Sequence, residues 1–441
     1  MTESVAAAAA WRELARRRVG VVAVCRVELR KLAAQVPLRF AAAVCLVAPF
    51  AFAAMLRVQQ AVPADTLFGR WVHASGFAVP LVVLGFAGSW GFPVLAGLVA
   101  GDLFSSEDRY GTWKTGLTRS CSRFELFAGK TAAAMLCTVG LVALLAVTSL
   151  AAGMLLAGDR PLLGLSGNVI PAGHAAGLVL ESFGLALVPT LGFTSLALLL
   201  SAASRSGIVG VLGPAIAGLV MQLLSLVGSG EVVRTLLLGT GFDAWHGLFA
   251  SPAFDRPAGQ AALVSLAYIL LLLGGAWVVV RRRDFAGASP EPRRRWLAPG
   301  CWGAAAAAAA ALLAVAAPLG PPTVTAGRLD AAITPAFTSL AALQQRELGH
   351  ELGGRTSMKV LTTCSRRGAS TPYRGPGDDW TCAITAVAPD LRQLPLNYDV
   401  DVRPNGCYTA HGPTSVGGST LRGRGAGKLN PLYAFDGCFE D

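Results

Sequence analysis

Long apolar runs alternate with short polar segments from residue 39 to residue 319. A helix rises ~1.5 Å per residue, so ~20 apolar residues cross the ~30 Å hydrocarbon core of a bilayer. The pattern therefore predicts an α-helical polytopic membrane protein. Its seven spans are expected at Arg39–Leu56, Phe77–Leu103, Thr131–Ala157, Val179–Ala202, Gly207–Val227, Gln260–Val280 and Trp296–Leu319.

The seventh run differs from the others because it contains eight consecutive alanines, Ala304–Ala311. Alanine is an excellent helix former but only marginally hydrophobic. The leucines that follow and the three arginines that precede the run favour insertion. If the run inserts, the segment after it lies outside the cell, where its cysteines can pair. If it does not insert, that segment is cytoplasmic and its cysteines remain thiols.

Composition and charge support this class of protein. The chain has 441 residues, of which 53% are hydrophobic and 14% charged, whereas soluble domains are ~25% charged. The net charge of +11 does not indicate nucleic-acid binding, because the arginines cluster at the ends of apolar runs. The positive-inside rule then places residues 104–130, 204–206 and 281–295 on the cytoplasmic side. The high ratio of arginine to lysine is typical of GC-rich bacteria, so we expect a multi-pass protein of a bacterial plasma membrane.

Residues 1–36 lack the apolar core and cleavage site of a signal peptide. Apolar residues recur every three or four positions and form a stripe: Val22, Cys25, Leu29, Leu32 and Val36. The arginines and the lysine of this segment lie off that stripe. This spacing predicts a basic amphipathic helix on the inner membrane surface, with a cytoplasmic N-terminus. Residues 231–258 are also rich in apolar side chains, and we expect short interfacial helices in the outer leaflet there, with His246 at the headgroup boundary.

Phe104–Lys130 is a charged, glycine-containing segment between the second and third spans. Its ionised groups would cost several kcal/mol each in hydrocarbon, so it must lie in water. It is basic overall, which favours the cytoplasmic face. Ser122 can cap a short helix in which Phe124 and Phe127 share a face.

After Pro321 the composition becomes that of a soluble domain. We predict an amphipathic helix at Leu329–Leu352 and strands at Met358–Thr362, Thr381–Val387 and Tyr398–Val402. Four cysteines lie in this part, which favours two disulfides in an oxidising compartment over a zinc site. Pairing Cys364 with Cys382 and Cys407 with Cys438 is the local choice, and two other connectivities remain possible.

The predicted organisation therefore has four parts. An interfacial helix (1–36) precedes a six-span domain (37–285), a basic linker with the seventh span (286–320) and a small disulfide-stapled α+β extracytoplasmic domain (321–441).

The sequence offers no catalytic constellation. Gly129-Lys130-Thr131 and Gly427-Lys428 imitate the end of a phosphate-binding loop, but each lacks its first glycine and its strand-to-helix context. No metalloprotease or serine-hydrolase motif occurs. We therefore expect no enzymatic activity and no cofactor or metal bound by this chain.

Several short motifs together resemble the membrane subunit of type-2 ATP-binding cassette (ABC) exporters. They are Glu107-x-x-x-Gly111-Thr112, Ser122-Arg123 and Gly129-Lys130 in the loop, the elbow-like Glu28-Leu29-Arg30-Lys31, and the boundary Val280-Arg281-Arg282-Arg283-Asp284-Phe285. The resemblance covers roughly residues 20–285. Cys121 stands where the family often has proline, and the seventh span and its tail are additional.

The resemblance implies a permease that works as a homodimer or with a second permease subunit. A separate cytoplasmic ATPase subunit would bind ATP and Mg²⁺ and receive the segment 104–130. The implied coupling residues are Glu107, Gly111, Trp113, Lys114, Arg123 and Lys130, and Glu28, Arg30 and Lys31 belong to the elbow helix. Alternatively, these side chains hold the loop at headgroup depth, and the protein is a membrane-anchored ligand-binding or sensor protein.

Overall fold

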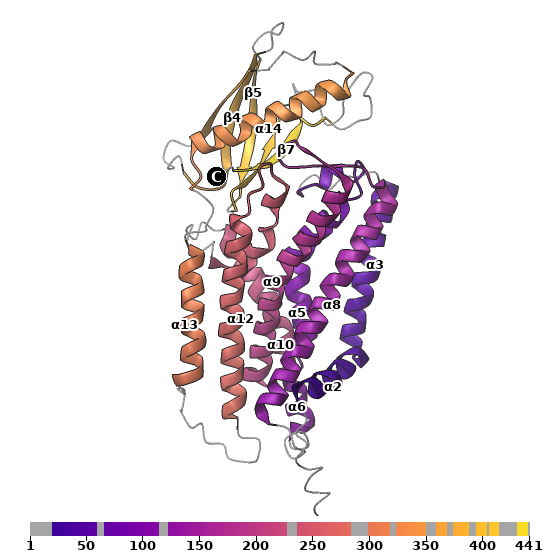
Figure 1. The fold of residues 1–441 in the computed structure, drawn as a ribbon, viewed down its shortest axis with the longest axis vertical. Coiled ribbons are helices and arrows are strands. Elements are labelled where there is room, and N and C mark those ends of the chain that lie inside the picture. The colour runs from indigo at the N-terminus through magenta and orange to yellow at the C-terminus, as the bar shows by residue number, and fades with distance from the viewer. Residues whose placement is uncertain are drawn as a thin grey trace, which may run out of the picture.

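The computed structural model describes residues 20–59, 66–113, 122–226, 236–283, 299–317, 323–349, 359–367, 374–387, 394–403, 405–413 and 430–439. A long body of helices carries a small helix-and-sheet domain at one end (Figure 1). Helices α2 and α6 lie at the other end of the body (Figure 1). The basic N-terminal helix and the C-terminal domain are therefore at opposite ends of the molecule.

The body contains a series of long apolar helices. After the short helix α2 (Val21–Ala34) they are α3 (Val36–Gln59), α4 (Ala78–Phe86) with α5 (Phe92–Ala100), α8 (Arg123–Ala157), α9 (Ala172–Ser204), α10 (Gly207–Leu226), α12 (Arg256–Arg282) and α13 (Pro299–Ala316). The short helix α6 (Ser105–Tyr110) follows α5. Two-residue strands β1 (Leu162–Leu163) and β2 (Val169–Ile170) connect α8 to α9, and 3₁₀ turns occur at Gly69–Trp71, Leu238–Asp243 and His246–Phe249.

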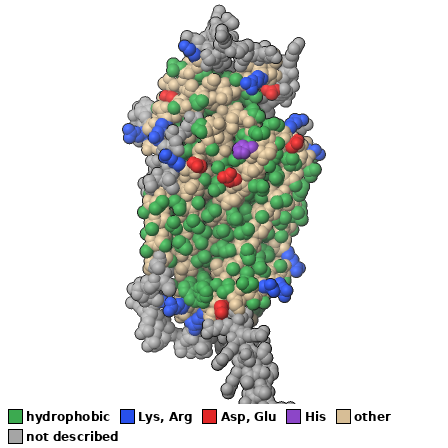
Figure 2. Space-filling model, in the orientation of Figure 1, with side chains coloured by type: hydrophobic (Ala, Val, Ile, Leu, Met, Phe, Trp, Pro, Cys, Tyr) green, Lys and Arg blue, Asp and Glu red, His purple; other side chains and the backbone are tan. Residues whose placement is uncertain are grey.

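Within the described residues, six helices are long and apolar enough to cross a bilayer. On the face shown in Figure 2, apolar side chains form a wide band over the middle of the body. Charged side chains gather toward its two ends (Figure 2). The fold is therefore that of a helical membrane protein with a C-terminal domain, as the hydropathy pattern predicts. Helix α13 packs beside α12 but is shorter than those six, so the seventh span stays a prediction.

Two spans differ in detail from the expected pattern. The second is interrupted by a π-helical turn at Ala87–Gly91, between α4 and α5. The third begins at Arg123 rather than Thr131, because a capping box starts it at Ser122. The Ser122 hydroxyl accepts a hydrogen bond from the Glu125 amide (3.1 Å), and the Glu125 carboxylate accepts one from the Ser122 amide (2.7 Å). The helix expected after Ser122 is therefore the first two turns of the span.

The C-terminal domain packs helix α14 (Ala326–Glu347) on a five-stranded antiparallel sheet. The helix begins where Thr325 accepts a hydrogen bond from the Arg328 amide (3.4 Å). The strands follow chain order across the sheet: β3 (Lys359–Arg366), β4 (Gly377–Val387), β5 (Leu394–Val402), β6 (Cys407–His411) and β7 (Ala434–Cys438). Leu329, Ile333, Phe337 and Leu340 recur on one face of α14 and are buried. Three strands were expected from the sequence; β6 and β7 are additional.

Both predicted disulfides are present, Cys364–Cys382 and Cys407–Cys438. Each joins residues that are direct partners in the strand register, in β3–β4 and in β6–β7. The local pairing was therefore correct because each pair lies on neighbouring antiparallel strands.

The domain contacts the body through both charged and apolar groups. Arg70 donates a hydrogen bond to the Ala434 carbonyl and pairs with Asp436 at 3.4 Å. Leu163 of β1 packs against the hydrophobic core of the domain. Cys407 and Cys438 belong instead to the large hydrophobic cluster of the body. The second disulfide thus lies where domain and body meet.

The described part of residues 231–258, expected as interfacial helices in the outer leaflet, packs its large aromatic side chains into the body instead. The 3₁₀ turns carry Phe242 and Phe249, and Trp245 directly precedes the second turn; all three side chains are buried in the body. His246 is also buried, and Asn405 of the domain donates a hydrogen bond to its Nδ1 (3.0 Å). The docked domain therefore covers His246, and its depth relative to the lipid headgroups stays a prediction.

Replacing Cys407 and Cys438 by alanine should lower the free energy of unfolding by about 2–4 kcal/mol. It should also loosen the docked domain, because this pair packs against the body. Replacing Cys364 and Cys382, which belong to the core of the domain, is the matched control and should destabilise the domain without loosening its docking. Thermal unfolding and limited proteolysis of the full chain in detergent measure the two effects. Alkylation of these cysteines in the denatured, unreduced protein would contradict the prediction.

Candidate functional site

The segment that follows the second span forms the short helix α6 at the end of the body away from the C-terminal domain (Figure 1). Ser201 of α9 accepts hydrogen bonds from the backbone amides of Phe104 and Ser105 (both 3.1 Å). Gly111 ends the helix in the left-handed conformation (φ 66°), which glycine adopts without steric cost. The ends of α6 are thus fixed by α9 on one side and by a glycine turn on the other.

A buried lysine lies at the centre of the site. Lys130 is on the third turn of α8, and only 2% of its side chain is exposed. Its Nζ lies 3.1 Å from Glu28 Oε2 and 3.0 Å from Glu107 Oε1, and it donates a hydrogen bond to the Leu103 carbonyl (3.4 Å). A buried ammonium needs such partners, because removing an unpaired charge from water costs several kcal/mol. Lys130 therefore links α2 and α6 to α8.

Lys31 completes the cluster from its solvent side. Its Nζ lies 3.0 Å from Glu28 Oε1 and 3.2 Å from Glu107 Oε1, and 52% of its side chain is exposed. Burial lowers the pKa of Lys31, but the Glu28 and Glu107 carboxylates outweigh that effect and raise the pKa above 10.5. Two acids and two bases thus form a cluster with no net charge (Glu28, Lys31, Glu107 and Lys130), called the four-charge cluster below.

A glycine allows α2 to approach α8 at this cluster. A Cβ on Gly129 would lie 2.5 Å from Val24 Cγ1, closer than two carbons can approach. The Gly129-Lys130 pair therefore has a structural explanation: the glycine leaves room for α2, and the lysine binds Glu28 on it.

The second acid of α6 binds the arginine at the C-terminal end of α12. Asp108 Oδ2 lies 2.7 Å from Arg283 Nη1, and Arg283 Nη2 donates a hydrogen bond to the Ala202 carbonyl at the end of α9 (2.6 Å). Burial lowers the pKa of Arg283, and the Asp108 carboxylate opposes that shift. Helix α6 is consequently linked to α12 and α9 as well as to α2 and α8.

Trp113 is buried at this site. Its ring is stacked 6.2 Å from Phe104, which is stacked 5.8 Å from Phe127 on α8. The side chain expected to anchor a partner therefore packs against the body and holds the end of the α6 turn.

The outer face of α6 has a different composition. Arg109, Tyr110, Gly111 and Thr112 are exposed, and 72% of Tyr110 is accessible. The Arg109 guanidinium lies 5.2 Å from the centre of the Tyr110 ring and 2.6 Å from Asp102. Thr112 donates a hydrogen bond to Glu107. These four residues, called the α6 tip below, present an arginine and a tyrosine to the surroundings.

The structure brings some predicted residues together and not others. Glu28, Lys31, Glu107 and Lys130 converge, although the elbow and coupling sets were derived separately. Arg30 is exposed on α2 and lies outside the cluster. Exposed Arg123 donates a hydrogen bond to the Arg281 carbonyl (2.6 Å) and so connects α8 to α12. Lys114 lies outside the described residues.

Sequence reasoning missed Asp102, Asp108, Ser201 and Arg283 as parts of this site. Asp108 lies beside Glu107 and Arg283 lies within the basic boundary of the sixth span, so each carried a signal as a charge at a membrane edge. Their pairing joins residues 175 positions apart, which no local pattern reveals. Among the described residues, no cluster of histidines, cysteines and acids suitable for a metal ion occurs.

The fold and the site thus define a helical membrane protein with a C-terminal domain and a bound loop helix at the opposite end. Residues 74–286 match a family described as a protein of unknown function (DUF2705). The match covers slightly less than half of the chain and runs from just before α4 to just past α12. No curated protein matches the sequence.

Proposed function

We propose that this chain is the membrane subunit of an ATP-driven exporter. A separate cytoplasmic ATPase subunit, carrying ATP and Mg²⁺, would bind the α6 tip. The observation that carries the proposal is the connection of α6 to four helices of the body, the short α2 and the long α8, α9 and α12. A force applied to the tip is transmitted through these contacts to helices on several sides of the body.

The proposed orientation has the N-terminus and α6 in the cytoplasm and the C-terminal domain outside. Support comes from the positions of Arg281, Arg282 and Arg283, at the same end of the body as α6, since cytoplasmic loops carry an excess of basic residues. The two disulfides at the other end suit an oxidising compartment. The proposed location is a bacterial plasma membrane, where the chain would work as a homodimer or with a second permease.

The geometry suggests distinct roles for the coupling residues. Arg109 and Tyr110 are exposed, and tyrosine and arginine are the residue types that contribute most to binding at interfaces. Glu107, only 13% exposed, is occupied by Lys130, Lys31 and Thr112. It therefore positions α6 rather than contacting the partner. Trp113 and Lys130 contact α6 and the residue before it from the side of the body, and Gly111 supplies the left-handed backbone conformation that ends the helix.

Tyr110→Ala should weaken association with the ATPase subunit, with a loss of about 2 kcal/mol if Tyr110 is a binding hot spot. The fold should be unaffected, because the ring is exposed. The measurement is co-purification of a tagged full chain from native membranes, with quantification of any ATP-binding-cassette subunit. Tyr433→Ala is the matched control, an exposed tyrosine in the C-terminal domain at the opposite end.

Two results would contradict the exporter proposal. One is the absence of any ATP-binding-cassette subunit beside the wild-type chain, which would favour the sensor alternative. The other is an equal yield of that subunit with Tyr110→Ala and Tyr433→Ala, which would remove the α6 tip as the docking surface.

A further inference from the structure

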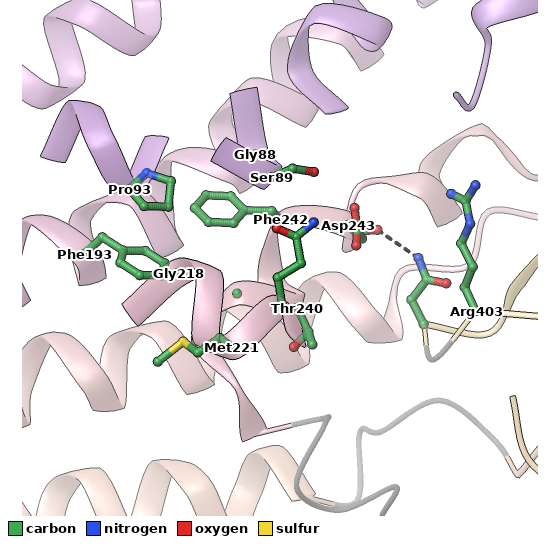
Figure 3. A pocket seen from close by; sticks show the side chains of 13 residues that line it. Gly88, Ser89, Pro93, Phe193, Gly218, Met221, Thr240, Phe242, Asp243 and Arg403 are labelled. Atoms are coloured by element: carbon green, nitrogen blue, oxygen red, sulfur yellow. Dashed lines mark hydrogen bonds between the residues drawn. The ribbon is translucent and has the colours of Figure 1, made fainter. Parts of the chain in front are cut away.

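A cavity lies between the helical body and the C-terminal domain. Its volume is about 220 Å³, and residues of α5, α9, α10, the π turn and the 3₁₀ turn line it together with Arg403 and Asn405 of the domain. Figure 3 shows side chains from all these elements around one space. An engineered cavity of ~150 Å³ holds a benzene molecule, so this one can hold the apolar part of a small ligand.

The inner part of the cavity is mainly apolar, although Gln222 and Thr240 also line the cavity. Pro93, Phe193, Met221 and Phe242 line it (Figure 3). Two glycines keep the walls close without filling the space: a Cβ on Gly88 would lie 3.0 Å from Phe242 Cβ, and one on Gly218 would lie 3.0 Å from Pro93 Cγ. This part suits an alkyl chain or a ring.

The π turn at Ala87–Gly91 contributes Gly88 and Ser89 to the wall. A π turn inserts a residue into a helix at a cost in stability, and such turns occur frequently at functional sites. Here the extra residue lies in the second span, at the cavity.

The part of the cavity nearest the domain is charged. The Asp243 side chain is 56% exposed and lies 3.8 Å from His246 Nε2. Burial and the neighbouring Arg403 guanidinium lower the pKa of His246 well below 6.5, so the imidazole is neutral and gives Asp243 no opposite charge. Burial raises the pKa of Asp243, and the nearby Arg403 guanidinium opposes that rise. Within the described part of the chain, the Asp243 carboxylate makes only the long contact to His246, and no ion pair or side-chain hydrogen bond to the Arg403 guanidinium occurs, although Asp243 and Asp401 are near enough to attract it.

Asn405 holds the C-terminal domain against the helical body beside this cavity. Its side-chain amide donates hydrogen bonds to the Asp243 carbonyl (3.1 Å) and to His246 Nδ1 (3.0 Å), and its oxygen accepts one from the Cys407 amide (3.0 Å). Figure 3 shows the contact to Asp243. These hydrogen bonds thus hold the carboxylate of the body and the guanidinium of the domain at one cavity.

We propose that this cavity binds a zwitterionic amphiphile, with its ammonium group on Asp243, its anionic group on Arg403 and its apolar chain among Phe193, Met221 and Phe242. The carboxylate and the guanidinium require opposite charges in the ligand, and the inner wall requires an apolar chain. A phosphoethanolamine headgroup carries both charges. The site needs both the body and the domain, and the inference does not depend on the exporter proposal.

The test is a titration of the detergent-solubilised full chain with octanoyl-lysophosphatidylethanolamine, followed by native mass spectrometry. We expect one saturable site in the wild type. Arg403→Gln, Asp243→Asn and Met221→Trp, which fills the apolar part, should each weaken binding about tenfold or more, ~1.4 kcal/mol per factor of ten. Arg328→Gln and Asp255→Asn, exposed residues outside the cavity, are the matched controls and should bind as the wild type does.

Two further probes identify the chemistry. Octanoyl-lysophosphatidylglycerol has the anionic group without the ammonium and should bind about tenfold more weakly. Free phosphoethanolamine lacks the chain and should not compete. Wild-type binding by Met221→Trp, or by the milder Met221→Phe if the first variant does not fold, would overturn the site. Equal affinity for the two lipids, together with no effect of Asp243→Asn, would overturn the zwitterionic ligand.

Discussion

Lys130→Ala should lower the free energy of unfolding by about 3–5 kcal/mol, the cost of leaving buried charges without their partner. Glu28 and Glu107 are only 7% and 13% exposed, and both contact Lys130 Nζ within 3.1 Å. Without the ammonium, two carboxylates face each other across a buried space, and Lys31 alone remains to compensate them. Unfolding by sodium dodecyl sulfate titration in mixed micelles measures the loss.

Lys31→Ala is the matched control for this prediction. It removes a lysine from the same cluster, but Lys31 is half exposed, so the loss should be about 0–1 kcal/mol. Adding Glu107→Gln to Lys130→Ala should recover part of the stability, because one unpaired charge is then removed. Equal losses for the two lysine variants would show that burial does not control the energetics of the cluster.

The parts of the fold that were predictable are those set by local pattern. Six spans follow from runs of apolar residues whose length matches the bilayer. The start of α8 follows from the capping box of Ser122 and Glu125, although the helix continues into the span instead of ending before it. The disulfides follow from short separations, because neighbouring strands of a meander bring nearby cysteines together.

The parts that were not predictable depend on contacts distant in sequence. The π turn of Ala87–Gly91 has no local signature, and the inward packing of the 3₁₀ turns depends on a domain that begins some 80 residues later. Strand β7 lies after a long segment outside the described residues, so its pairing with β6 is a tertiary property.

The candidate site was predictable in location but not in detail. Charge and glycine content identified residues 104–130 as a special segment, and the ABC-exporter resemblance assigned Glu107 and Arg123 to an external partner. In the structure Glu107 turns toward Lys130, and Arg123 donates to the Arg281 carbonyl. The physical reason for the first is that a buried lysine needs an opposite charge, and Glu107 is within reach across a helix junction. The sequence shows which residues are charged, but it does not show which partners their side chains face.

The arrangement of α6 explains how one short helix can influence a much larger body. It carries adjacent acids, and each binds a different side: Glu107 reaches α2 and α8, whereas Asp108 reaches α12 through Arg283. Both ion pairs are largely buried, so they are screened little by salt. A displacement of α6 must therefore either break these contacts or move the attached helices with it.

Gly210→Leu should prevent correct folding, and Gly210→Ala should destabilise the protein by about 1–3 kcal/mol, the usual cost of overpacking. Helices α5 and α10 cross here in direct backbone contact. A Cβ on Gly210 would lie 2.0 Å from the Gly101 carbonyl oxygen, and a Cβ on Gly97 would lie 2.1 Å from that of Val211. A backbone atom cannot change rotamer to make room for the added side chain, so α5 and α10 must move apart. Such close crossings through small residues are a main source of helix association in membranes.

Separation of α5 and α10 should also disturb α6, because the crossing lies immediately before that helix. Asp102, one residue after Gly101, accepts hydrogen bonds from Ser105 (2.7 Å) and Arg109 (2.6 Å). Fluorescence-detected size-exclusion chromatography after heating measures stability, and Gly140→Leu is the matched control, a glycine of α8 with no atom within 4 Å of a built Cβ. We expect Gly140→Leu to behave as the wild type. If Gly210→Leu were as stable as Gly140→Leu, α5 and α10 would not be in backbone contact, and the rigid support proposed for α6 would be lost.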